Sequence, residues 1–448
     1  TRMAPEVEEG IRRACGVPDP EYARRNLDRR NQRSLMSNAA RVGMAYARSG
    51  DPRRARMLVV YLLEHKRRPE LGHDTHMELW KTIRAWDNVE ECPAISDDER
   101  LEITNYLLHI LRSHEGVFNS MFVGSLGRSV VRHNHHMLAA MDAYYGGHYF
   151  RKYHQLEDAD EWLDMAEFCF ASQEMHDKGQ DESGNYEMST ALRPLLPYAY
   201  TEPGYLFLPS GVARSFLERC CTDIDNRYSL SGHGDCWDVD CFAPLALGIG
   251  AWYYRDRGYQ YILEERHRTR PREKHSMQIQ PPFRMDGVVK PERPARFEGV
   301  NVSPLNPGHD KLYRGGGDLK WNLPREEGFD KISFRTRFEP DAQYLLMDGI
   351  ACGSHGHRDA NCLIRFTDND RVWLVDDSYT EGPFLSDHNG VLVIRDGIAE
   401  AMPALARLDA VADFDEVGIA RTTLPDHSGV DWERNVVWIK EKCFVVLD

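Results

Sequence analysis

The feature that most constrains the fold of this chain is a change in sequence pattern along its length. From about Asn31 to Tyr259, apolar residues recur at the spacing of helices that bury one face, and strand-like alternation is nearly absent. The region therefore predicts helices in series, an arrangement that suits an α/α toroid. The predicted helices are Leu35–Arg48, Ala55–His65, His76–Trp86, Asp97–Ser113, His135–Tyr145 and Ala159–Ser172.

A second pattern begins after an Arg- and Pro-rich stretch that runs from about Arg266 to Pro294. Beyond Leu319 the chain carries short β-branched and aromatic runs, which predict strands. The clearest runs are Phe334–Phe338, Tyr344–Asp348, Leu363–Phe366 and Arg371–Val375. We therefore expect a helical domain over 1–265, a connector over 266–318 and an antiparallel β-sheet domain over 319–448, with α and β segregated.

Composition limits the class of protein. With 448 residues, 42% of them hydrophobic, the chain is long enough for at least two cores. Its formal charge of −15 argues against a general nucleic-acid-binding protein, so an anionic substrate would need a local basic site. No apolar run reaches the roughly 18 residues of a membrane span. We see no signal peptide, the ends resemble those of a trimmed chain, and ten scattered cysteines suggest neither a disulfide scaffold nor a zinc finger.

A histidine-rich segment, Gly353–Asn361, precedes the predicted hairpin. Its His355 and His357 are two residues apart, so on extended chain both side chains point the same way. A carboxylate, Asp376, ends the hairpin, and His388 follows soon after. These residues could simply be polar groups at the ends of a surface hairpin. As a set, however, they indicate a metal site.

In that interpretation His357, Asp376 and His388 form a mixed nitrogen and oxygen donor set suited to zinc, with manganese or calcium as alternatives. His355 would be a fourth ligand or remain available for catalysis. Asp359 and Asn361 could orient the ligands from behind. A turn at 367–370 would place Asp376 opposite about Cys362, so the histidine segment must fold back to reach it.

Two polar clusters stand out in the helical half. Asn134 and His135, within Arg132–Met137, begin a predicted helix. As an alternative to a functional role, Asn134 could simply be the N-cap of this helix. Tyr186 lies in the acidic turn Asp181–Glu187, and a lone tyrosine can equally be a packing residue.

Taken together, these motifs resemble the heparinase II/III-like polysaccharide lyases. The histidine segment with its following Val-Asp and His-Asn pairs is similar to the core of that family's β domain, and it is the most specific part of a likeness that covers most of the chain. The resemblance implies an incomplete α/α toroid followed by an antiparallel β-sandwich, here truncated at its C-terminus. It also implies secretion or a periplasmic location, and a metal that braces the histidine segment.

The activity implied by the resemblance is β-elimination on a uronic-acid polymer. Asn134 would then bind the substrate carboxylate, His135 would assist it or act as base, and His355 would be the other base candidate. Tyr186 would protonate the leaving oxygen or act as base. Two departures weaken this transfer: Leu138 stands where some relatives carry Glu, and Leu192 and Arg193 stand where others carry the tyrosine. Tyr198 therefore remains a rival to Tyr186.

Substrate-binding residues are predicted only in outline. Arg128, Arg132 and Arg193 could receive carboxylates or sulfates, or could be ordinary exposed arginines, and Trp237 could stack on a sugar ring or belong to the core. The resemblance favours glycosaminoglycans such as hyaluronan, chondroitin sulfate or heparan sulfate, with alginate second. A hydrolase that uses the His/Asp cluster to hold a catalytic metal and a non-catalytic polysaccharide-binding protein are the alternatives. The oligomeric state stays open.

Overall fold

A computed structural model of the chain describes the residues 32–67, 78–123, 134–171, 174, 192–230, 244–269, 289–305, 312–314, 317–319, 322–351, 358–376, 388–397 and 402–448. The chain divides into two compact units. One comprises residues 1–131 and 135–171, and the other comprises residues 132–134 and 172–448.

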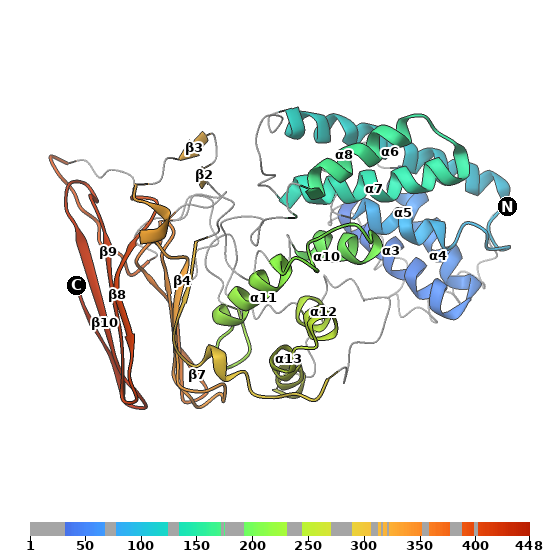
Figure 1. Cartoon of the computed structure of the whole chain (residues 1–448). Helices are drawn as coiled ribbons and strands as arrows, with labels where there is room; N and C mark the ends of the chain where they lie inside the picture. The colour runs from blue at the N-terminus through green and yellow to red at the C-terminus, as the bar shows by residue number, and fades with distance from the viewer. Residues whose placement is uncertain are drawn as a thin grey trace. The chain divides into compact units, whose positions relative to one another are not determined.

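The first unit is helical (Figure 1). Its helices are α3 (Gln32–Ser49), α4 (Pro52–Lys66), α5 (Leu79–Asp87), α6 (Asp97–Val123), α7 (Asn134–His154) and α8 (Asp158–Ala171). Helix α3 packs against α4 and α5, and α4 also packs against α6. The sequence periodicity had predicted a helix in each of these regions, and the prediction is confirmed.

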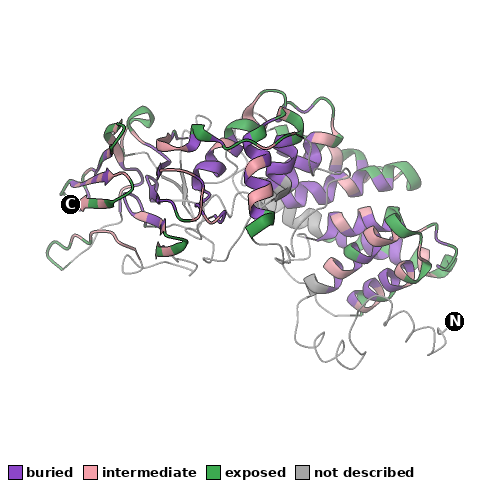
Figure 2. Cartoon of the chain, turned by 90° about the horizontal axis from the view of Figure 1, so that it is seen from below, coloured by how far each residue is buried: buried purple, intermediate pink, exposed green. Residues whose placement is uncertain are grey.

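Helix α4 illustrates how local sequence and burial combine. Asp51 caps the helix by accepting a hydrogen bond from the backbone N–H of Arg53, and Pro52 occupies the first helical position, where its missing N–H costs nothing. Leu58 and Leu62, four residues apart, are both fully buried. Figure 2 shows the buried residues on the helices of this unit in purple, with exposed residues in green.

The second unit begins with further helices and continues into strands. The helices are α10 (Leu192–Thr201), α11 (Val212–Asp223), α12 (Pro244–Tyr254) and α13 (Arg257–Thr269), followed by the short helices η2 (Ala295–Phe297) and η3 (Arg325–Glu327). Helix α12 packs against α10, α11 and α13. Helix α11 also contacts β1 and β4, so the helices and the sheet of this unit share one packed interior.

The strands form two larger antiparallel sheets and a small hairpin. Their bounds are β1 (Gly299–Ser303), β2 (Leu312–Arg314), β3 (Gly317–Leu319), β4 (Lys331–Arg335), β5 (Tyr344–Asp348), β6 (Leu363–Asp368), β7 (Arg371–Val375), β8 (Arg407–Asp413), β9 (Val417–Leu424), β10 (Trp432–Ile439) and β11 (Cys443–Leu447). The order is β1-β4-β5-β6-β7 in one sheet and β11-β10-β9-β8 in the other, and β2 pairs with β3.

The two larger sheets pack face to face. Phe334 of β4 meets Trp438 of β10 edge-on at 6.0 Å between ring centroids, and Trp438 stacks on Phe444 at 5.7 Å. Both belong to a core that draws residues from both sheets. In Figure 1 the four-stranded sheet (red) lies beside the five-stranded sheet (orange). The predicted fold class, a helical N-terminal region followed by antiparallel sheets in a sandwich, is confirmed.

The hairpin β6–β7 carries the predicted metal ligand Asp376. Its turn residues Asn369 and Asp370 both have positive φ, as a tight two-residue turn requires. A register shift in β6–β7 pairs Phe366 with Leu374, and the Asp376 N–H donates to the carbonyl of Ile364 at 2.9 Å. The expectation that Asp376 lies opposite Cys362 is therefore wrong, because the turn is tighter than assumed and the strands contain a bulge.

Two other strand predictions need correction. The strand predicted over Phe334–Phe338 is β4, Lys331–Arg335, which lies three residues earlier and is buried along its whole length. Strand β1, Gly299–Ser303, lies within the stretch predicted as a connector, yet it pairs with β4 at the edge of the larger sheet. The bounds proposed for the domains stay a prediction.

Buried polar contacts join α11 and the loop after it to the five-stranded sheet. Arg365 of β6 donates through Nε and Nη2 to Asp225, at 3.0 and 2.9 Å, with side chains 4% and 0% exposed. Arg335 of β4 donates to Asn226 at 2.6 Å. The hydroxyl of Tyr344 donates to the carbonyl of Thr222 at 2.9 Å. Burial without such partners would cost several kcal/mol, so these contacts fix the orientation of the helix on the sheet.

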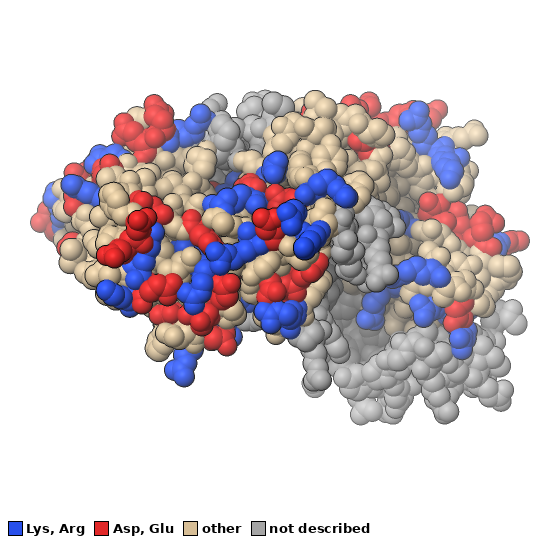
Figure 3. All heavy atoms as spheres, turned by 60° about the horizontal axis from the view of Figure 1, so that its bottom comes forward, with Lys and Arg blue, Asp and Glu red and all other residues tan. Residues whose placement is uncertain are grey.

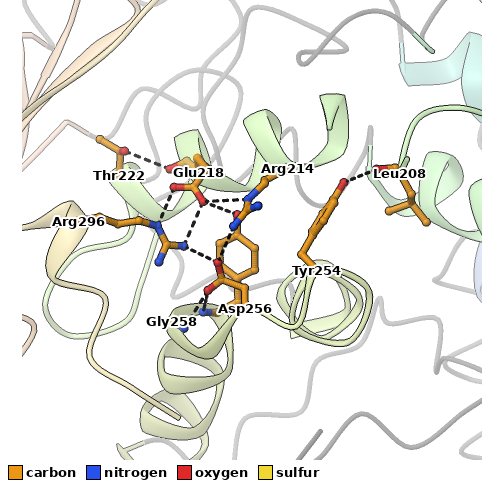
Figure 4. A network of polar contacts seen from close by, with 9 residues as sticks. Leu208, Arg214, Glu218, Thr222, Tyr254, Asp256, Gly258 and Arg296 are labelled. Atoms are coloured by element: carbon orange, nitrogen blue, oxygen red, sulfur yellow. Dashed lines mark hydrogen bonds and ion pairs between the residues drawn. The ribbon is translucent and has the colours of Figure 1, made fainter. Parts of the chain in front are cut away.

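A second network holds the segment after residue 289 against the helices (Figure 4). Arg296 bridges Glu218 of α11 and Asp256, which precedes α13, at 3.0 Å to each carboxylate. Arg214 reaches the same Asp256 at 3.3 Å. The hydroxyl of Tyr259 donates to Glu218 at 2.7 Å, and the Arg296 guanidinium lies over the Tyr259 ring. Two arginines and two carboxylates thus tie three segments of the unit together.

Basic and acidic side chains are interspersed on the face drawn in Figure 3. Many arginines of the second unit are in ion pairs, for example Arg293 with Glu298 and Arg337 with Asp341. Along the described residues, no helix is both long enough and apolar enough to span a membrane.

Candidate functional site

The histidine segment lies between β5 and β6. His355 and His357 are outside the described residues, but the chain on both sides of them is placed. Before the segment, Ala351 donates its N–H to the carbonyl of Ala404 at 2.8 Å. After it, the Asn361 N–H donates to the carbonyl of Asp348, also at 2.8 Å. The segment therefore leaves and re-enters the sheet close to the end of β5.

Two of the predicted metal ligands lie together. Asp376 directly follows β7, and its Oδ1 is 2.7 Å from Nδ1 of His388. Both side chains are 0% exposed. A buried carboxylate beside an imidazole supplies the mixed oxygen and nitrogen donors predicted for zinc. Over the part of the chain that the structure describes, no third His, Cys, Asp or Glu joins them in a metal-binding group. The predicted third ligand, His357, lies outside that part.

Asn361, predicted to orient the ligands, is a buried backbone anchor. It has a φ of 66°, a left-handed conformation that Asn tolerates better than most residues. Its Oδ1 accepts a hydrogen bond from the Thr422 hydroxyl at 2.5 Å, and its Nδ2 donates to the Trp432 carbonyl at 3.4 Å. Asn361 thus ties the end of the histidine segment to β9 and β10 of the opposite sheet.

Sequence analysis assigned no role to two residues that contact this region, although one of them, Asn389, belongs to the His-Asn pair of the motif. Asn389, next to His388, pairs its side-chain amide with both backbone groups of Leu363, and Arg434 of β10 contacts Asn361, Asn389 and Asp448. A signal for Arg434 was present in the sequence. It occupies an inward-facing position of β10, between Trp432 and Val436, where a charged residue needs buried partners.

A buried ion cluster lies at the end of β5. Lys331 is 2.9 Å from Asp330 and 2.9 Å from Asp348, and all three side chains are less than 5% exposed. Burial opposes the charge on Lys331, but the two carboxylates outweigh it and raise the pKa of Lys331 above its ordinary value. Asp348 also accepts the Ile350 N–H at 2.9 Å, so the cluster anchors the strand end from which the histidine segment leaves.

The helical candidates are only partly placed. Asn134 and His135 are the first residues of α7, but their side chains are outside the description. Arg193 lies in α10 with its side chain likewise outside it. Arg128, Arg132, Tyr186 and Trp237 lie outside the described residues altogether.

Tyr198, the rival to Tyr186, is described. It lies in α10, is 7% exposed, and packs edge-on against Tyr205 at 5.0 Å between ring centroids. The ring of Tyr198 is therefore largely enclosed and has an aromatic neighbour in the same unit.

Comparisons with known proteins add information about the fold. No model of a known family matches the chain, and no curated protein gives a significant match. Solved structures do match. A structure of heparinase III has a TM-score of 0.56 at 12% identity, covering 90% of this chain and 60% of that one.

Two further matches are of the same kind. The heparan sulfate lyase HepC from Pedobacter heparinus has a TM-score of 0.50 at 14% identity and covers 90% of this chain and 59% of that one. A heparinase III gene product with methylated lysines has a TM-score of 0.51 at 13% identity and covers 91% and 62%. The chain thus spans about three fifths of the length of these structures. It has the fold of the heparinase III-type heparan sulfate lyases, and the resemblance first inferred from the histidine segment is confirmed for the fold.

Proposed function

We propose that the chain is a polysaccharide lyase that cleaves a uronic-acid-containing polymer by β-elimination, with a glycosaminoglycan as substrate. The observation that carries the proposal is the fold shared with heparan sulfate lyases over 90% of the chain. The buried Asp376–His388 pair adds support, because the sequence motif that contains both residues suggested the same class of enzyme. Such polymers are extracellular, so we also propose a secreted or periplasmic location.

The proposed chemistry follows from the acidity of the substrate. The proton at C5 is adjacent to a carboxylate and is removed only if the negative charge that develops there is stabilised. Asn134 would hydrogen-bond the carboxylate, and His135 or His355 would remove the C5 proton. A tyrosine would then protonate the departing C4 oxygen. We assign this role to Tyr186, because Tyr198 is buried against Tyr205. Arg128, Arg132, Arg193 and Trp237 remain the proposed substrate contacts.

We propose a bracing role for the metal. Zinc would be held by Asp376, His388 and His357, with manganese or calcium as alternatives. One observation supports this donor set: Asp376 and His388 are both buried, with Asp376 Oδ1 2.7 Å from His388 Nδ1. A bound ion would cross-link the chain after β7 to the histidine segment. Elimination needs no metal-bound hydroxide, so the chemistry is assigned to the side chains.

The decisive experiment is to incubate the protein in turn with hyaluronan, chondroitin sulfate, heparan sulfate and alginate while following ultraviolet absorbance. Elimination creates a conjugated, absorbing unsaturated uronate, whereas hydrolysis does not. A rise with one polymer supports the lyase and names its substrate class. New reducing ends without absorbance would indicate the hydrolase, and polymer binding without either product would indicate a binding protein.

The proposed tyrosine has a matched control within the chain. Tyr186→Phe removes only a hydroxyl, and we expect it to lower kcat by about 10²-fold or more, the usual size of a general-acid contribution. Tyr198→Phe should leave the activity nearly intact. If Tyr198→Phe lost activity and Tyr186→Phe kept it, the acid would be Tyr198 of α10.

Metal content is checked separately from activity. We expect His388→Ala and Asp376→Asn to lose bound zinc in elemental analysis of the purified protein, because each removes one of the proposed ligands. His109→Ala, which alters an exposed histidine of α6, is the control and should leave the metal content unchanged. Full zinc in both ligand variants would refute the coordination.

A further inference from the structure

The side chain of Asn389 takes the place of a strand neighbour beside β6. Its Oδ1 accepts the N–H of Leu363 at 2.8 Å, and its Nδ2 donates to the carbonyl of the same residue at 2.6 Å. These are the two hydrogen bonds that an adjacent strand would supply. Because Asn389 follows His388 directly, this pairing fixes the backbone that carries His388 against the start of β6.

Arg434 contacts Asn389 from the opposite sheet. Its Nη1 donates to Asn389 Oδ1 at 2.9 Å, and its Nη2 donates to the Asn389 carbonyl at 3.0 Å. Nη1 also donates to the carbonyl of Asn361 at 2.9 Å. One guanidinium therefore contacts both chain segments that flank the candidate site, the one after the histidine segment and the one after His388.

The remaining donors of Arg434 reach Asp448. Nε lies 2.7 Å from Asp448 Oδ1, and Nη2 lies 2.9 Å from Oδ2. A guanidinium has five N–H donors, and these five contacts engage it fully. Burial opposes the charge on Asp448, but its hydrogen bond with Arg434 outweighs this effect and lowers the pKa of Asp448. The contacts with Asp448 therefore fix the orientation of the Arg434 guanidinium.

The stability of the core alone does not explain why an arginine occupies this position. A core position between Trp432 and Val436 would be filled at lower desolvation cost by an apolar residue. Instead, the 4% exposed guanidinium directs three of its five hydrogen bonds at two residues that flank the predicted ligands. Lysine could not make these contacts at once, because its ammonium is a point charge rather than a planar fork.

We propose that Arg434 is a positioning residue: through Asn389 and Asn361 it holds His388 beside Asp376 and so sets the geometry of the metal-binding pair. This inference rests on the proposed function for the metal, but not on any particular substrate. In this role Arg434 acts through Asn389 and Asn361, which it contacts directly.

The test compares Arg434→Lys with Arg421→Lys. The first retains a positive charge opposite Asp448 but loses the fork, whereas the second alters an exposed arginine on the neighbouring strand β9, 52% exposed in its pair with Glu433. We expect Arg434→Lys to weaken zinc binding about 10–100-fold in a chelator competition, as loss of a residue behind a metal ligand does. The visible spectrum of the cobalt(II)-loaded protein should change as well. Arg421→Lys should match the parent in both.

Hydrogen exchange on the metal-free protein gives an independent readout. In Arg434→Lys, peptides that cover 358–368 and 388–394 should exchange faster, while those of β8 should not change. If zinc affinity, cobalt spectrum and exchange all match the parent, the positioning role is refuted, whatever polymer the enzyme cleaves. If instead no polymer is cleaved but these three readouts shift, the proposed function fails and the positioning role stands.

A second variant guards against a folding defect. Asn389→Ala removes the pairing with Leu363 and leaves the Arg434–Asp448 pair in place. It should reproduce the loss of zinc affinity and the faster exchange at 388–394. A variant that folds like the parent and keeps full zinc affinity would contradict the proposal.

Discussion

Asp142 is a carboxyl group enclosed in the helical unit. It is 1% exposed, and its Oδ1 accepts the Trp80 N–H at 2.8 Å near the start of α5. Burial raises the pKa of Asp142 well above its ordinary value, and the nearby Glu78 adds to the effect. The folded state therefore binds a proton that the unfolded state has released, and stability falls as the pH rises from the unfolded pKa toward the folded one.

Asp142→Asn should stabilise the protein at neutral pH. The amide oxygen can still accept the Trp80 N–H, and the neutral side chain removes the cost of either burying a charge or retaining a proton. We expect a higher melting temperature at pH 7, by about 2 °C or more. The gain should disappear below about pH 4, where the carboxyl is protonated in both states. Asp164→Asn, at an exposed position of α8, should leave the melting temperature unchanged at both pH values. If Asp142→Asn raised the melting temperature equally at both pH values, the raised pKa of Asp142 could not be the cause.

At the scale of single residues, sequence analysis predicted members of the candidate site only where the residue type itself indicates a chemical role. Asp376 and His388 were predicted because carboxylates and histidines are metal ligands, and the structure brings them together. No role was predicted for Arg434 or for Asn389, although Asn389 belongs to the motif's His-Asn pair, because their roles depend on which backbone groups lie nearby. Pairing an amide with the backbone of Leu363 leaves no pattern in the sequence.

Among the elements, α11 and the loop after it are fixed to the five-stranded sheet by buried ion pairs. Asp225 is 0% exposed, its Oδ1 accepts the N–H groups of Arg227 and Ser229, and its Oδ2 is engaged by Arg365. The attraction must offset the cost of removing both charges from water. Taking away one partner leaves the other charge buried.

Arg365→Met tests this junction. Because the Asp225 carboxylate would lose its buried cation, we expect unfolding to become easier by about 3–5 kcal/mol. Denaturant titration followed by near-ultraviolet circular dichroism measures the change. Arg421→Met removes an arginine whose pair with Glu433 is largely exposed, and it should have little effect. Similar small effects for the two variants would mean that water reaches the Arg365–Asp225 pair.

Element prediction succeeded where turn chemistry and side-chain pattern agree. Strands β5 and β7 match the predicted runs at both ends, since each is a short apolar run bounded by polar turns. The prediction for β4 began three residues too late, because the strand starts at Lys331, whose buried ion pairs with Asp330 and Asp348 leave no apolar signal in the sequence. Strand β1 was missed although Val300 and Val302 alternate with polar residues, because so short a run lay within the stretch interpreted as a connector. Its place in the sheet comes from pairing with β4.

For the molecule as a whole, the division into two units has a thermodynamic consequence. The first unit has its own buried interior, with Trp80, Trp86 and Trp162 all at most 2% exposed. The second has the core between its sheets, with Trp438 at its centre. Each interior is large enough to support a cooperative transition of its own.

We therefore expect two transitions in scanning calorimetry of the full chain, and the variants described above assign them. Asp142→Asn should move only the transition of the helical unit, and Arg365→Met only that of the unit that holds the sheets, because each substitution lies within one core. Zinc should raise the second transition alone, since a ligand stabilises the structure to which it binds. A single transition that shifts with either variant would show instead that the units unfold together. In that case the free energy that couples them would exceed the difference between their separate stabilities.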